Sequence, residues 1–172
     1  APYKDDTPNQ PLLPVLPKAG HIVSQRHESA LGIERIELSN GVTVLLKPTS
    51  TGKDELLMTA FAPGGLSRLE QADFANARFF NRIVGSSGLG DFSSQQLTKV
   101  LTGQTANVNL SLDTYWLSLN SSASTRDAEC LLQQTYLYFT ALRPNQQAFD
   151  NIMANSRARL SQVAGLPEMA LS

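Results

Sequence analysis

The alternation of apolar and polar residues predicts two β-hairpins and one buried strand. Residues 33–46 alternate on both sides of Asn40 and Gly41. These two residues tolerate the positive φ of a type I′ turn, so the stretch is expected to be a hairpin. Residues 105–122 alternate in the same way, which predicts a second hairpin with one solvated face. Residues 55–62 are apolar on both faces, which favours a central, buried strand.

A repeat of three to four residues predicts four helices. The first apolar stripe lies in residues 72–83, and the second helix lies in residues 93–103 with Ser93 as the N-cap of a capping box. Two longer helices have stripes in residues 128–139 and 149–163. The stripe of the third helix consists of Ala128, Leu131, Leu132, Thr135, Tyr138 and Phe139.

The element order is therefore β-β-β-α-α-β-β-α-α. Hairpins with helices segregated onto one face of an antiparallel sheet define an α+β fold. Six of the 9 prolines fall between Pro2 and Pro48. Their spacing favours an extended, polyproline-like backbone. We expect residues 1–30 to be a proline-rich linker and residues 31–172 to be one α+β domain, incomplete at its C-terminal end. The end of the last helix is expected at Gly165.

Charge and composition narrow the classes of function. The net charge is -1 with a pI near 6.1, and no run of Lys or Arg occurs, so neither nucleic acid nor an anionic membrane is expected as a partner. No apolar run approaches the roughly 20 residues of a membrane span. Both histidines, His21 and His27, lie in the predicted linker without zinc-ligand spacing. Cys130 lies beside an apolar stripe and is interpreted as an inert thiol.

Four segments resemble the insulinase/pitrilysin family of zinc peptidases. They are "LSNGVTVLLKPT", "LLMTAFAPGG", "SGLGDFSSQQLTKVLTG" and "LLQQTYLYFTALRPNQQAFDNI". The resemblance is greatest to the non-catalytic half-repeat of the bacterial, often periplasmic, branch. It implies a fold like that of pitrilysin and the mitochondrial processing peptidase, and a periplasmic or secreted location.

The family carries an inverted zinc motif, H-x-x-E-H, on the helix that follows the Gly-rich end of a strand. Here the motif falls near residues 77–81, where Ala77, Phe80 and Asn81 stand in place of His, Glu and His. A further Glu ligand, expected near residues 155–157, is also missing. The resemblance thus implies no catalytic residue and no metal site in this segment. Zinc is expected in a separate active half-repeat.

The function implied is that of a non-catalytic domain that encloses an extended peptide substrate, with the catalytic half-repeat of the same protein as its partner. Two alternatives stay open from the sequence. One is a structural or partner subunit of the same fold without protease activity. The other is a free-standing module that binds a peptide or a cofactor.

Overall fold

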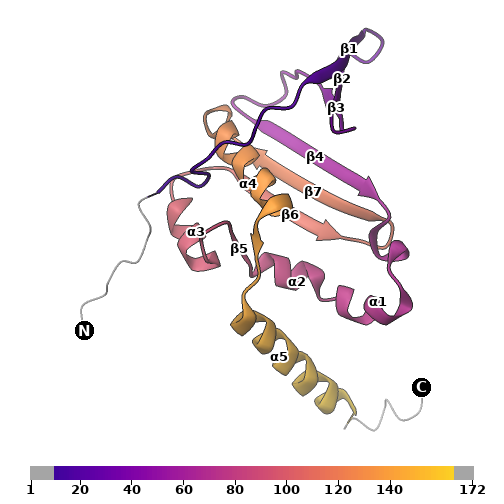
Figure 1. Ribbon diagram of the computed structural model, residues 1–172, viewed down its shortest axis with the longest axis vertical. Coiled ribbons are helices and arrows are strands. Elements are labelled where there is room, and N and C mark those ends of the chain that lie inside the picture. Colours follow the sequence, from indigo (N-terminus) through magenta and orange to yellow (C-terminus); the bar gives the residue numbers. More distant parts are fainter. Residues whose placement is uncertain (1–9, 165–172) are drawn as a thin grey trace. The chain divides into compact units, whose positions relative to one another are not determined.

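The computed structural model describes residues 10–164, which form two compact units (Figure 1). The hairpin unit is Leu13–Glu55. The main unit, in its described part, is residues 10–12 and 56–164. The chain passes from one unit to the other between residues 12 and 13 and again between residues 55 and 56. The linker at residues 1–30 and the single domain at residues 31–172 stay a prediction. The first part of the predicted linker and the predicted helix end at Gly165 lie outside the described residues.

The hairpin unit is a three-stranded antiparallel sheet in the order β1 (Ile22–Glu28), β2 (Ile33–Leu38) and β3 (Thr43–Leu46). The predicted hairpin in residues 33–46 is confirmed, but its turn is not type I′. Gly41 has a positive φ of 84° and Asn40 does not. The Gly41 amide donates to the carbonyl oxygen of Leu38 at 2.9 Å. A tight turn followed by a left-handed glycine is the usual three-residue hairpin loop with a bulge.

Part of the predicted linker is a strand, because β1 pairs with β2 from Ile22 to Glu28, with a shift of register between Ile22 and Ser24. Its side chains do not alternate between apolar and polar, so the strand is held by backbone hydrogen bonds and cross-strand polar pairs. His27 Nδ1 lies 2.6 Å from Glu34 Oε1, and Gln25 Nε2 donates to Glu34 Oε2 at 3.3 Å. The hydrogen bonds from His27 and then Gln25 lower the pKa of the Glu34 carboxyl. His27 is therefore a cross-strand partner.

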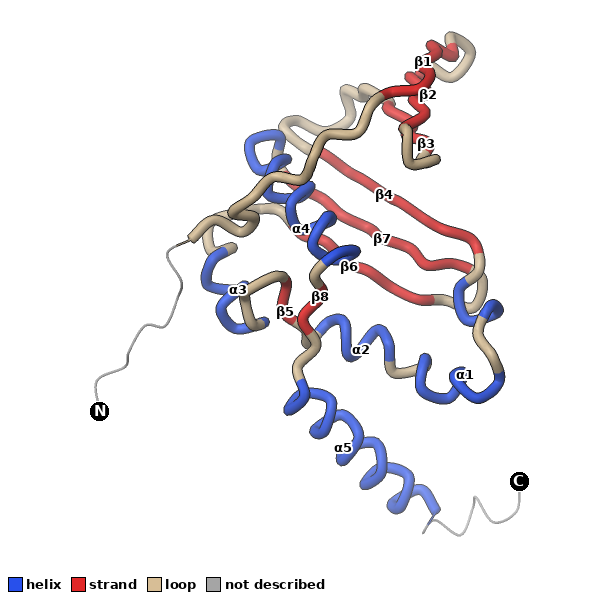
Figure 2. Tube along the Cα trace, viewed as in Figure 1, coloured by secondary structure: helices blue, strands red, loops and turns tan. Residues whose placement is uncertain are grey.

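The main sheet has the order β4-β7-β6, all antiparallel, with β4 at Leu56–Pro63, β6 at Asn107–Leu112 and β7 at Trp116–Ala123 (Figure 2). The predicted second hairpin is β6 and β7, and its polar face is solvated. The prediction of a central buried strand at residues 55–62 was wrong, because β4 lies at the edge. Leu57 and Phe61 are 69% and 68% exposed. Their face of the sheet is left open by the helices, which pack on the other face (Figure 1).

Helices and short strands complete the main unit. The helices are α1 (Gln71–Ala77), α2 (Phe80–Gly85), α3 (Ser94–Val100), α4 (Ala128–Thr140) and α5 (Gln146–Ala164). A 3-10 turn at Gly65–Arg68 precedes α1, and a second one at Thr125–Asp127 precedes α4. A two-stranded ladder is formed by β5 (Gly88–Leu89) and β8 (Leu142–Arg143). The capping box of Ser93 is confirmed at the start of α3. The predicted single helix at residues 72–83 is instead two helices.

The core lies between the sheet and the helices. It consists of Val84, Ala106, Val108, Leu110, Leu119, Ala123 and Leu131. On α4 the residues buried toward the sheet are Leu131, Gln134 and Leu137. Leu132 and Phe139, which the sequence placed on the same stripe, are 56% and 57% exposed. Helix α4 is apolar on two faces, and the sheet covers one of them. This arrangement confirms the predicted α+β fold. Within residues 10–164, no helix combines the length and apolarity that crossing a bilayer requires.

Candidate functional site

The segment that aligns with the zinc motif is interrupted. Helix α1 ends at Ala77 and α2 begins at Phe80. Arg78 and Phe79 between them keep φ and ψ close to helical values, at -61° and -20° and at -90° and -7°. The chain therefore bends at this point without leaving the helical region. The motif positions are split between the end of one helix and the start of the next.

Asn81 connects this segment to the sheet. Its Nδ2 donates to the carbonyl oxygen of Leu112 at 3.1 Å, and the Leu112 amide donates to its Oδ1 at 2.7 Å. The Asn81 side-chain amide thus forms, with the last residue of β6, the two hydrogen bonds that the backbone of a neighbouring strand would form. Asparagine has a donor and an acceptor at this spacing, whereas a neutral imidazole cannot offer both to one residue in this way. Phe80, the preceding motif position, packs against the core.

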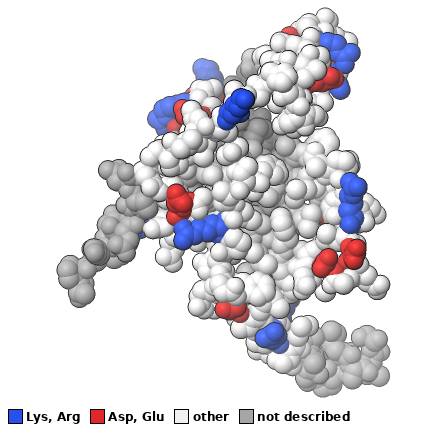
Figure 3. Space-filling view, viewed as in Figure 1, with Lys and Arg blue, Asp and Glu red and all other residues white. Residues whose placement is uncertain are grey.

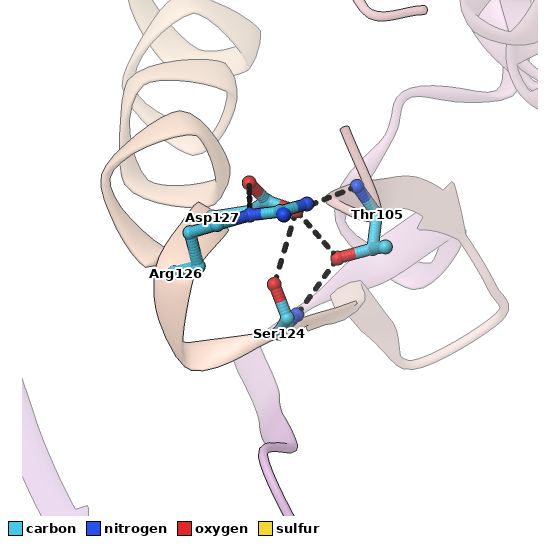
Figure 4. A network of polar contacts seen from close by, with 4 residues as sticks. All are labelled: Thr105, Ser124, Arg126 and Asp127. Carbon is cyan, nitrogen blue, oxygen red and sulfur yellow. Dashed lines mark hydrogen bonds and ion pairs between the residues drawn. The ribbon is translucent and has the colours of Figure 1, made fainter. Parts of the chain in front are cut away.

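A buried carboxylate that the sequence did not predict as important is the centre of a polar network (Figure 4). Asp127 is 4% exposed. Its Oδ2 accepts from the Thr105 amide at 2.9 Å, from Thr105 Oγ1 at 2.7 Å and from Ser124 Oγ at 3.0 Å. Arg126 Nε lies 3.3 Å from Oδ1. These hydrogen bonds, from Thr105 first and then Arg126 and Ser124, hold the pKa of the carboxyl well below its ordinary value.

The Asp127 network is structural. The carboxylate joins the loop before β6 to the start of α4, because Thr105 and Ser124 donate to Oδ2 and Arg126 pairs with Oδ1. The Ser-x-x-Asp spacing of residues 124–127 by itself favours a helix with Ser124 as its N-cap and Asp127 in its first turn. The structure differs, because residues Thr125–Asp127 form a 3-10 turn and Asp127 is itself the N-cap residue of α4. The Ser-x-x-Asp spacing was the signal available in the sequence.

Three known proteins with a similar sequence or fold are described as proteases. No family model matches the chain. A curated protein of Arabidopsis thaliana, described as "Zinc protease PQQL-like", is 29% identical over 101 residues, which is 59% of this chain and 11% of that protein. The crystal structure of the periplasmic protease PqqL from Escherichia coli matches with a TM-score of 0.83 and 19% identity, over 99% of this chain and 19% of that one. The chain has a pitrilysin-like fold, and its sequence is similar to that of a protein described as a zinc protease.

A second solved structure agrees with this conclusion. The ferredoxin protease FusC, in complex with Arabidopsis ferredoxin, matches with a TM-score of 0.80 and 19% identity, over 95% of this chain and 18% of that one. At these identities the structural likeness shows the fold. This pitrilysin-like chain spans less than a fifth of the length of each of these three relatives.

The residues at the pitrilysin motif positions do not fit a zinc ion. Ala77 and Phe80 carry no donor atom, and both polar atoms of the Asn81 amide are already bonded to Leu112. The region where a Glu ligand was expected, residues 155–157, lies in α5 and reads Asn-Ser-Arg. No group of three or more His, Cys, Asp or Glu side chains with metal-binding proximity occurs within residues 10–164.

Two of the cavities in the described part of the main unit contain residues discussed above. One, of about 430 Å³, is lined by residues 10–12, the end of α3 and the start of α4, including Cys130. Burial raises the pKa of the Cys130 thiol, and Gln134 Nε2 is its hydrogen-bond partner at 3.5 Å. This environment agrees with the predicted inert thiol. The other cavity, of about 320 Å³, is lined by Ala75, Arg78, Phe79 and Arg82. It lies on the α1–α2 segment, beside the motif positions.

Proposed function

We propose that this chain is a non-catalytic, substrate-enclosing domain of a zinc peptidase, and that a separate half-repeat with an H-x-x-E-H helix carries out hydrolysis. The observation that carries the proposal is the double hydrogen bond between Asn81 and Leu112. A position that would hold a zinc ligand in an active half is used here to hold the helix against β6. In this proposal the fold around the zinc site is retained, and the Asn81–Leu112 contact takes the place of a metal ligand.

The printed descriptions of the relatives support a peptide or protein substrate. One relative is called a zinc protease, one a periplasmic protease, and one a ferredoxin protease in complex with a ferredoxin. We extend this to the present chain by proposing an extended peptide as the enclosed ligand and a periplasmic or secreted location. The catalytic half-repeat of the same protein is the proposed partner.

The main sheet offers a surface for such contacts. Strand β4 pairs on one side with β7 and has no strand on its other side within the main unit as described. An edge strand presents free backbone N–H and C=O groups, to which an extended chain can add. The open face beside this edge carries Leu57, Phe61 and Trp116, and the rings of Phe61 and Trp116 meet edge to face with centroids 5.4 Å apart.

The test is reconstitution with a separately produced active half-repeat. We expect the purified chain to bind no stoichiometric zinc and to hydrolyse no peptide with any added metal. Added in trans, it should raise the turnover of unfolded peptides by the active half. Single alanine substitutions of its exposed Ser, Asp or Glu residues should change that turnover by no more than a few fold, because the contribution is geometric.

Three results would contradict the proposal. About one tightly bound zinc per chain by elemental analysis would show a metal site in this segment. A single Ser, Asp or Glu substitution that abolished reconstituted turnover with the fold intact would show a catalytic group. A parent reading frame without any H-x-x-E-H segment would instead favour a structural subunit of the same fold.

A further inference from the structure

Two arginines share one face of the α1–α2 segment. Arg78 lies at the bend and Arg82 in α2, four residues apart, so their side chains are neighbours on the helical surface. Each follows a motif position by one residue, which places it about 100° further round the helix. Both are exposed, and together with Ala75 and Phe79 they line the cavity of about 320 Å³.

These two guanidinium groups have no counter-charge in the described part of the chain. No ion pair or side-chain hydrogen bond is formed by Arg78 or Arg82 within residues 10–164. Among the described arginines, Arg35 pairs with Glu37, Arg126 with Asp127 and Arg143 with the carbonyl of Asp91, whereas Arg26 and Arg68 resemble Arg78 and Arg82 in forming no such contact. Like charges four residues apart on a helix repel each other. An anion bound between them would relieve that repulsion.

The surroundings select among anions. A guanidinium group offers parallel N–H donors that match the two oxygens of a carboxylate. Phe79 and Ala75 add an apolar wall, which suits a carboxylate attached to an apolar body and does not suit a free, fully hydrated phosphate. On the face of the molecule seen in Figure 3, the charged side chains form small groups of mixed sign.

We propose that Arg78 and Arg82 form a carboxylate-binding site for peptides, with Phe79 contacting the apolar part next to the carboxylate. The carboxylate can belong to the peptide's C-terminus or to an Asp or Glu side chain. The inference deepens the proposed function, on which the choice of a peptide as the ligand rests. An active half would carry a metal cation at the motif positions, whereas this chain carries two arginines beside the corresponding positions of its α1–α2 segment.

The experiment measures binding to the purified chain, without zinc and without an active half. The probes are a neutral hexapeptide with a free C-terminus, its C-terminal amide, an amidated hexapeptide with two Glu residues, and inorganic phosphate. Titration is followed by the arginine Nε–Hε signals in nitrogen-15 NMR and by calorimetry. We expect at least one carboxylate peptide to shift the Arg78 and Arg82 signals, and the neutral amide to shift neither. The responding peptide identifies the source of the carboxylate.

Variants separate a specific site from general charge attraction. The double substitution Arg78→Ala and Arg82→Ala should weaken binding at least about tenfold, because it removes charge-assisted hydrogen bonds. The matched control, Lys47→Ala with Lys53→Ala, removes the same charge from exposed positions of the hairpin unit and should change affinity by less than about twofold. Arg78→Lys with Arg82→Lys keeps the charge and should bind with intermediate affinity. Circular dichroism confirms the fold of each variant.

Three outcomes would overturn the inference. They are no binding of either carboxylate peptide, equal weakening by the lysine control, and phosphate binding as tight as that of the carboxylate peptides. None of these would affect the reconstitution test of the proposed function, which reads turnover. Intact carboxylate binding together with no stimulation of an active half would overturn the proposed function and leave the carboxylate site standing.

Discussion

Leu131 and Leu132 are adjacent residues of α4 that the sequence placed on one apolar stripe and the structure places in opposite environments. Leu131 is 0% exposed and belongs to the core, whereas Leu132 is 56% exposed. The same substitution, Leu to Ala, at the two positions tests this assignment directly. Alanine favours a helix at least as well as leucine, so backbone propensity does not confound the comparison.

The expected costs differ by several-fold. Leu131→Ala removes a fully buried side chain and leaves a cavity, which should lower the free energy of unfolding by about 3–5 kcal/mol. With a urea dependence of about 2 kcal/mol per molar, the unfolding midpoint should fall by about 1.5–2.5 M. Leu132→Ala removes a side chain that already contacts water over more than half its surface. Its cost should stay below about 1 kcal/mol.

The assay is urea unfolding followed by the fluorescence of Trp116, the chain's single tryptophan, which lies in β7 and so reports on the main unit. The measurement is repeated at two protein concentrations. An equal cost at both positions would refute the assignment of the faces of α4. A cost at Leu132 that grows with protein concentration would show that a second copy of the chain covers the outer face.

The polar contacts and the buried thiol lead to three further predictions. Because the folded-state pKa of Asp127 is lowered chiefly by the Thr105 hydrogen bonds, its stabilising contribution is complete above the ordinary value of 3.8 and is lost as the pH falls below it. Asp127→Asn should therefore lower the urea midpoint at pH 7, and its difference from the unsubstituted chain should shrink in acid; a constant difference would count against the network. Asn81→Ala should cost about 1 kcal/mol and speed hydrogen exchange at the Leu112 amide, while Asn81→Asp, which keeps the acceptor, should leave that amide protected. Cys130 should react with a maleimide at pH 8 at least about tenfold more slowly in the folded chain than in urea, since burial raises its pKa; equal rates would show an accessible thiolate.

Local patterns determined much of the secondary structure. The hairpin in residues 33–46, the hairpin of β6 and β7 and the capping box at Ser93 depend on neighbours within a few residues. Period-two alternation and a Ser-x-x-Gln spacing carry that information directly. The α+β class followed from the order of these elements. The placement of the zinc-motif positions at residues 77–81 stays a prediction, made from the resemblance of the surrounding segments to those of the family.

The tertiary structure decided which apolar face is buried. Residues 55–62 are apolar on both sides, and so is α4, so periodicity could not tell which side of either element meets the core. The packing of α4 on a single face of the sheet made β4 an exposed edge and left Leu132 and Phe139 outside. Burial of one face against a partner element is a property of the assembled layers.

Contacts between distant residues were also beyond the reach of the sequence. Asn81 meets Leu112 across 31 residues, and Asp127 meets Thr105 across 22. Strand β1 forms because β2 supplies its hydrogen-bond partners, although its own side chains show no alternation. The sequence determined that residues 77–81 lack zinc ligands. Only the fold could show that Asn81 holds the end of β6, because a polar side chain's role depends on which backbone groups the chain brings within reach of it.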